Sequence, residues 1–139
     1  MSVFKLKKIV ASGLGSAFDF DQFIKLRKDR YVLSFHRVIS AKNAERDGVH
    51  HSLWITPDTL ASQIKWMQKV GKVVDYKRLI NSNGLHDRPL FALTFDDGWK
   101  DNYEYALPIL KQYQAPALIF LATEAVESGE LFWPQDIAT

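Results

Sequence analysis

Apolar residues along the chain fall into continuous runs, separated by stretches in which they recur with helical spacing. Residues 90–95 and 117–122 are almost entirely apolar, a pattern typical of parallel strands that are buried on both faces. Residues 31–35 form a third apolar run and predict another buried strand. Between these runs, Thr56 and Pro57 begin a helix whose apolar residues repeat along one face as far as Gly71. Strands that alternate with helices predict an α/β fold with a parallel sheet or barrel.

Weaker patterns predict the other elements. Asp19 and Gln22 resemble a capping box and predict a helix that runs to about residue 29. The remaining expected segments are a polar loop at 40–55, a short strand at 72–74, a helical turn at 76–81 and a helix at 103–113. A closed (β/α) barrel typically takes about 250 residues. If the architecture is a barrel, the 139 residues here would form about its first half.

The composition is that of a single soluble globular domain, with 47% hydrophobic and 24% charged residues. The net charge of +2 is too small to imply a nucleic-acid partner. No apolar run approaches the roughly 20 residues of a transmembrane helix. Because the chain has no cysteine, it can form neither a disulfide nor a thiolate metal site. Any bound metal must therefore use oxygen or imidazole ligands.

The first residues bear on localisation. Lys5, Lys7 and Lys8 precede a short apolar stretch broken by Gly13, which is a weak match to a signal peptide. The other interpretation is a short amphipathic helix that rests on a protein or membrane surface. The pattern slightly favours a cytoplasmic or membrane-peripheral location over secretion.

Two adjacent carboxylates, Asp96 and Asp97, follow the apolar run at 90–95 and precede Gly98. Neighbouring side chains in a strand point to opposite faces, so both can serve one site only where the strand has ended and the chain turns. Gly98 allows such a turn, and α/β folds place their active sites at the ends of parallel strands. One carboxylate could bind a divalent metal while the other acts as a general base. Capping of the following helix explains the pair equally well.

The segment Thr94-Phe95-Asp96-Asp97-Gly98 resembles the first signature of the polysaccharide deacetylases, carbohydrate esterase family 4, also called the NodB homology domain. Residues 33–38 resemble a Tyr-His-Arg-Val element of the branch that contains exopolysaccharide deacetylases. Individually weaker similarities lie at residues 56–70, 106–110, 116–121 and 131–133. The resemblance implies a partial (β/α) barrel of the deacetylase type. Residues 30–139 would form the N-terminal part of that domain, after an N-terminal helical segment at residues 1–29.

The resemblance also implies a chemistry. The chain would hydrolyse N-acetyl groups of a carbohydrate or polysaccharide with the help of a divalent metal, most commonly zinc. Asp96 would be the catalytic base and Asp97 a metal ligand. Family members complete the metal site with His-x-x-x-His on a later strand end. The four histidines here, His36, His50, His51 and His86, contain no such pair.

Three further residues are candidates for the vicinity of substrate or metal. His36 ends a strand expected to run parallel to the one bearing Asp96, so it should emerge on the same rim; a structural role is as plausible. Trp99 and Tyr103 follow the motif and could stack on sugar rings, although core packing explains them at least as well. His50, His51 and His86 lie in expected loops and are not predicted to be ligands.

Other functions remain open or are disfavoured. A phosphatase of the haloacid dehalogenase type would want Asp-x-Asp-Gly, and the chain has neither that spacing nor a Gly-rich phosphate loop followed by lysine. The main alternative is a truncated, catalytically incomplete deacetylase-like domain that binds glycan, assembles with another chain or is inactive. Unpaired strands at the barrel edges would make self-association possible. The sequence does not distinguish among glycans or metals.

Overall fold

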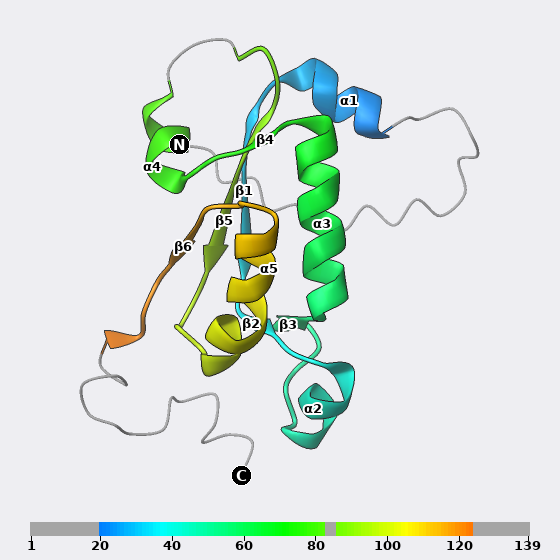
Figure 1. Cartoon of the computed structure of the whole chain (residues 1–139), viewed down its shortest axis with the longest axis vertical. Coiled ribbons are helices and arrows are strands. Elements are labelled where there is room, and N and C mark those ends of the chain that lie inside the picture. The colour runs from blue at the N-terminus through cyan, green and yellow to red at the C-terminus, as the bar shows by residue number, and fades with distance from the viewer. Residues whose placement is uncertain (1–19, 83–85, 124–139) are drawn as a thin grey trace.

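Figure 1 shows the computed structural model of the chain, which describes residues 20–82 and 86–123. The elements, in chain order, are α1 (Phe20–Arg27), β1 (Arg30–Phe35), β2 (Arg37–Val38), α2 (Ala41–Arg46), β3 (Trp54–Ile55), α3 (Pro57–Val70), β4 (Lys72–Val73), α4 (Tyr76–Asn81), β5 (Leu90–Phe95), the π-helical turn η1 (Asn102–Ala106), α5 (Leu107–Gln112) and β6 (Ala117–Ile119).

The main sheet is parallel and is organised around β5. β1 pairs with all six residues of β5, from Arg30 opposite Leu90 to Phe35 opposite Phe95. β4 and β6 share the other edge of β5, β4 at its beginning and β6 at its end. All these pairings are parallel, so the carboxyl ends of β1 and β5 meet at one rim. This arrangement confirms the predicted α/β class and is that of a partial barrel.

Apolar residues bury β5 on both faces, as its sequence predicts. Phe91, Leu93 and Phe95 lie in the main core with the apolar side of α3, whereas Leu90 and Ala92 belong to a second cluster that includes residues of α4. Figure 1 shows α3 and α5 side by side next to the sheet. Full burial of one such large apolar side chain stabilises the fold by about 1.5–3 kcal/mol. β5 is thus the most firmly fixed strand described, and the acidic turn follows it directly.

The long helix α3 begins and ends where the sequence predicts. The Thr56 side chain caps it by accepting a hydrogen bond from the backbone N–H of Thr59, and Pro57 occupies the first turn. Gly71 follows the last residue, but its φ of −151° is extended rather than left-handed. A Cβ there would lie 2.4 Å from the carbonyl oxygen of Pro89. Gly71 is therefore needed for the close approach of two chain segments.

Two strands are less buried than their apolar sequences predict. β1 alternates, with Tyr31, Leu33 and Phe35 facing the core and Val32 41% exposed on the opposite face. At β6, which forms the first half of the strand expected at 117–122, Ile119 is 45% exposed. Within the described part of the chain, β1 and β6 each pair with β5 alone. Whether both faces of a strand are buried depends on the elements that cover it, and these cannot be predicted from the sequence of the strand itself.

The segment at 40–55 is not the plain loop that its polar sequence predicts. The Ser40 side chain accepts a hydrogen bond from the Asn43 backbone and so caps the short helix α2. Residues 54–55 form β3, which pairs with β2. The cap explains how this polar segment folds as a helix.

The helix expected at 103–113 is divided. It begins as η1, in which the Leu107 N–H bonds to the carbonyl of Asn102, and continues as α5. Pro108 lies in the first turn of α5, and its ring would clash with the carbonyl four residues earlier in a regular helix. The wider π turn relieves that clash. Such turns recur at functional sites.

Helix α1 packs against α3. Ile24 is buried in the main core, and Asp21 accepts hydrogen bonds from the indole of Trp66 and the ammonium of Lys69, both at 2.7 Å. The domain division at residue 29 stays a prediction, and residues 1–19, with the proposed surface helix, lie outside the described residues. Over residues 20–82 and 86–123, no helix is long and apolar enough to span a membrane.

Candidate functional site

The acidic pair occupies a tight turn directly after β5. The Asp96 backbone N–H still bonds to the carbonyl of Phe35, at 2.8 Å, so Asp96 is held at the end of the sheet. Asp97 and Gly98 then adopt positive φ angles of 71° and 73°. Left-handed backbone costs a non-glycine residue about 1–2 kcal/mol, least for Asn and Asp. Two consecutive residues of this kind reverse the chain and leave both carboxylates at the rim.

His36 stands beside Asp96, because it directly follows β1 and β1 runs parallel to β5. Its Nε2 lies 3.9 Å from Oδ2 of Asp96, too far for a direct hydrogen bond but close enough for a bridging water. The two side chains are 39% and 32% exposed. A substrate group can therefore approach either of them from solvent.

Trp99 contacts the second carboxylate. Its indole Nε1–H donates to Oδ2 of Asp97 at 3.2 Å, and its ring lies under the guanidinium of Arg37, with Cζ 4.4 Å from the ring centroid. Trp99 is thus part of the site's framework as well as a partly exposed aromatic surface. Tyr103 is different, since its side chain is 73% exposed on η1. Trp133 lies outside the described residues.

Arg37, Asp101 and Asn102 form an interaction that sequence reasoning missed. Arg37 Nε donates to Oδ2 of Asp101 at 2.7 Å, and the Val38 N–H donates to Oδ1 of the same carboxylate at 3.0 Å. The amide of Asn102 donates to the carbonyl of His36 at 2.9 Å. Asp101 and Asn102 precede the helix expected at 103–113, but their side chains do not cap it. Asp101 instead holds β2, and Asn102 holds the carbonyl of His36. The sequence gives one weak signal, a basic residue next to a rim histidine.

The donors at the rim fit part of a metal site. Aspartate oxygens and imidazole nitrogens are ligands that zinc takes, and Asp96, Asp97 and His36 supply them. Within residues 20–82 and 86–123, no three His, Asp or Glu side chains gather closely enough to hold an ion. A catalytic zinc usually has three protein ligands. The three rim side chains alone therefore do not form such a site.

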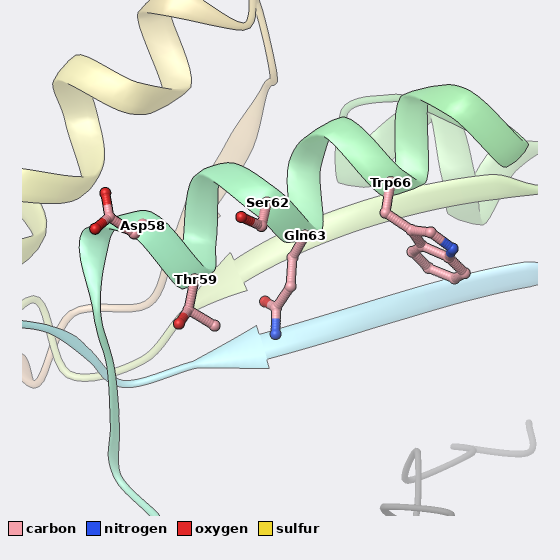
Figure 2. Close-up of a pocket in the computed structure, with 5 residues that line it drawn as sticks. All are labelled: Asp58, Thr59, Ser62, Gln63 and Trp66. Carbon is pink, nitrogen blue, oxygen red and sulfur yellow. The ribbon is translucent and has the colours of Figure 1, made fainter.

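A separate hollow of about 380 Å³ lies along α3 and is lined by Asp58, Thr59, Ser62, Gln63 and Trp66. Figure 2 shows these side chains projecting from the helix, with Gln63 and Trp66 on the same side. None of the predicted site residues lines it. The hollow is therefore distinct from the rim that carries Asp96 and Asp97.

Comparison with known proteins shows which proteins the chain is similar to. A family model described as polysaccharide deacetylase matches residues 83–138, which include the acidic turn. The curated protein YxkH of Bacillus subtilis, provisionally named a polysaccharide deacetylase, is 24% identical over 99 residues, covering 68% of this chain and 32% of that protein. The chain thus spans about a third of the length of this relative.

Solved structures of deacetylases are also similar to this chain. IcaB from Ammonifex degensii matches with a TM-score of 0.55 and 26% identity, covering 66% of this chain and 37% of IcaB. The deacetylase PplD of Streptococcus pyogenes matches with a TM-score of 0.53 and 28% identity, covering 78% and 49%. A de-N-acetylase from Aggregatibacter actinomycetemcomitans shares the fold, with a TM-score of 0.59 and 24% identity over 74% of this chain and 42% of that one. These matches confirm the relationship to polysaccharide deacetylases that the Thr-Phe-Asp-Asp-Gly segment predicts.

Proposed function

We propose that this chain contributes the base and one metal ligand of a metal-dependent carbohydrate deacetylase. The observation that supports the proposal is the acidic turn after β5, in which Asp96 precedes Asp97 directly and His36 lies 3.9 Å from Asp96. The similarity to polysaccharide deacetylases suggests the reaction, removal of an acetyl group, that this geometry would serve. PplD was solved with acetate, the product that deacetylation releases.

The reaction adds water to an acetamide and yields acetate and an amine. Asp96 would take the proton from water. Its carboxylate is about one-third exposed while its backbone is held by the sheet, which supports this role. Asp97 would hold a divalent cation, of which zinc is the first candidate. Such an ion, when bound, polarises the acetamide carbonyl and makes the water more acidic. His36 would bind a substrate hydroxyl or the water that bridges to Asp96.

The division of roles between the two carboxylates follows from their surroundings. One oxygen of Asp97 already accepts from the Trp99 indole, so its orientation is fixed as a ligand requires. No described Lys or Arg pairs with Asp96, and its carboxylate is open to a water molecule. A fixed ligand beside an accessible base is the arrangement that the reaction needs.

A second candidate is an incomplete deacetylase-like domain that binds glycan or assembles with another chain. It is favoured by the partial ligand set at the rim, since no three His, Asp or Glu side chains of the described residues gather there to hold an ion. Exposed apolar residues at the end of β6, Phe120 (47%) and Leu121 (59%), would suit assembly.

Acetate release from N-acetylglucosamine oligomers separates the two candidates. The enzyme proposal expects release that a chelator stops and zinc restores. It also expects that the coding frame beyond Thr139, if it continues, encodes His-x-x-x-His. Glycan binding without acetate release, in the presence of zinc, would favour the incomplete domain.

A further inference from the structure

A continuous series of contacts links the buried residue Asp101 to the proposed metal ligand Asp97. Asp101 binds the side chain of Arg37, the Arg37 guanidinium lies over the ring of Trp99, and the Trp99 indole donates to Asp97. These residues come from β2, which follows β1 closely, and from the chain after β5. The series therefore spans the two strand ends that form the rim.

Its inner end is rigid. Asp101 is 5% exposed, and each of its carboxylate oxygens has a partner, Arg37 Nε on Oδ2 and the Val38 N–H on Oδ1. The Arg37 side chain is itself only 15% exposed. A charge-assisted bond of 2.7 Å between two groups shielded from water is stronger than an exposed ion pair. The guanidinium is thus fixed in place independently of Trp99.

The middle of the series is a cation–π contact. The distance of 4.4 Å from Arg37 Cζ to the Trp99 ring centroid is well inside the range of about 6 Å in which a cation is attracted by the ring. The fixed guanidinium limits the tilt of the indole. Withdrawal of electron density by the cation also makes the indole N–H a stronger donor.

We propose that Arg37 is a positioning residue for Asp97 and acts through the ring of Trp99. Held in this way, the Trp99 N–H occupies Oδ2 of Asp97 and would leave Oδ1 as the oxygen for a cation. Asp97 would then bind a cation through one oxygen. This last consequence rests on the proposed function, whereas the link from Arg37 through Trp99 to Asp97 does not.

A purely structural role for Arg37 makes a different expectation. β2 and His36 before it are also held by the Val38 N–H on Asp101 and by the Asn102 amide on the carbonyl of His36. If Arg37 only adds to that attachment, its replacement should lower stability and leave the indole N–H of Trp99 as it was. Hydrogen exchange of that single N–H distinguishes the two roles.

The experiment follows indole N–H exchange by ¹⁵N NMR in the full chain without metal, with Trp99→Phe used to assign the signal. Arg37→Lys keeps a cation for Asp101 but loses the planar group over the ring. We expect it to speed exchange of the Trp99 N–H on the order of tenfold, the scale of a partly buried cation–π contact. Asp97→Gly removes the carboxylate that accepts the hydrogen bond from Trp99, and glycine tolerates the positive φ at this position. This variant should therefore speed the same exchange.

The Trp66 indole is the matched control, since it also donates to an aspartate, Asp21, at 2.7 Å. Its exchange should be the same in Arg37→Lys as in the wild type. If Arg37→Lys does not fold, the double variant Arg37→Gln with Asp101→Asn keeps a neutral hydrogen-bonded pair and tests the same point. Unchanged exchange of the Trp99 N–H in the variant that folds overturns the proposal.

Failure of this inference is distinguishable from failure of the proposed function. An unchanged Trp99 signal together with loss of acetate release in Asp96→Asn would remove only the role of Arg37. A changed Trp99 signal with full activity in Asp96→Asn would leave the contact series standing and refute the deacetylase assignment.

Discussion

Replacement of Asp101 by alanine should destabilise the fold far more than replacement of any exposed acid. The substitution removes the partner of the Arg37 guanidinium and the acceptor of the Val38 N–H at once. The two side chains of the ion pair are only 15% and 6% exposed, so water cannot readily replace the lost carboxylate. β2 would lose both of its hydrogen bonds to Asp101.

The magnitude follows from the burial of the pair. Leaving one member of a buried ion pair without its partner costs about 3–5 kcal/mol. The same substitution also removes the acceptor of the Val38 N–H, and the range of about 3–5 kcal/mol includes that loss. With a urea dependence of about 2 kcal/mol per molar, the unfolding midpoint should fall by about 2 M.

Equilibrium unfolding in urea, followed by circular dichroism, measures this change. Asp87→Ala is the matched control, because Asp87 pairs with Lys72 at 3.0 Å but its side chain is 72% exposed. Exposed pairs contribute little, so the control should leave the midpoint almost unchanged. Equal midpoints for Asp101→Ala and Asp87→Ala would refute the reasoning that burial makes the Arg37 pair strong.

Three other predictions concern the turn, the strand approach and α1. Gly98→Ala should lower the free energy of unfolding by about 1–2 kcal/mol, because φ is +73° there; a urea midpoint equal to that of the wild type would contradict this. Gly71→Ala should cost about 1–3 kcal/mol in thermal or urea unfolding, since the new methyl would meet the Pro89 carbonyl. The pKa of Asp21 is lowered below its ordinary 3.8, first by the hydrogen bond from Lys69 and then by that from the Trp66 indole. Its stabilising contribution is therefore present above pH 3.8 and lost as the pH falls through the lowered value, so α1 amides should exchange faster only in strong acid, and Asp21→Asn should abolish that dependence.

The central strand, the long helix and the acidic turn could be predicted because their signals are local. A continuous apolar run is sufficient for β5, and Thr56, Pro57 and Gly71 mark the limits of α3. The turn at Asp97 could be predicted because Gly98 follows two acids that can share a site only outside a strand. In each case neighbouring residues in the sequence carry the information.

The features that escaped prediction depend on distant partners. Arg37 and Asp101 are 64 positions apart, and no sequence pattern between them predicts that they pair. The exposure of Val32 and Ile119 depends on which elements cover β1 and β6. The π turn before Pro108 forms because the proline ring does not fit a regular α-helix at this position. Tertiary contacts decide all of these.

The most direct test of the deacetylase assignment is acetate release by the wild-type chain and by Asp96→Asn in the presence of zinc. The wild type should release acetate from N-acetylglucosamine oligomers, and Asp96→Asn should do so at least about 100-fold more slowly, the usual contribution of a general base. Asp58→Asn, an exposed acid at the start of α3, should match the wild type. Full activity in Asp96→Asn, or no release by the wild type, would contradict the assignment of Asp96 as the base of an active deacetylase.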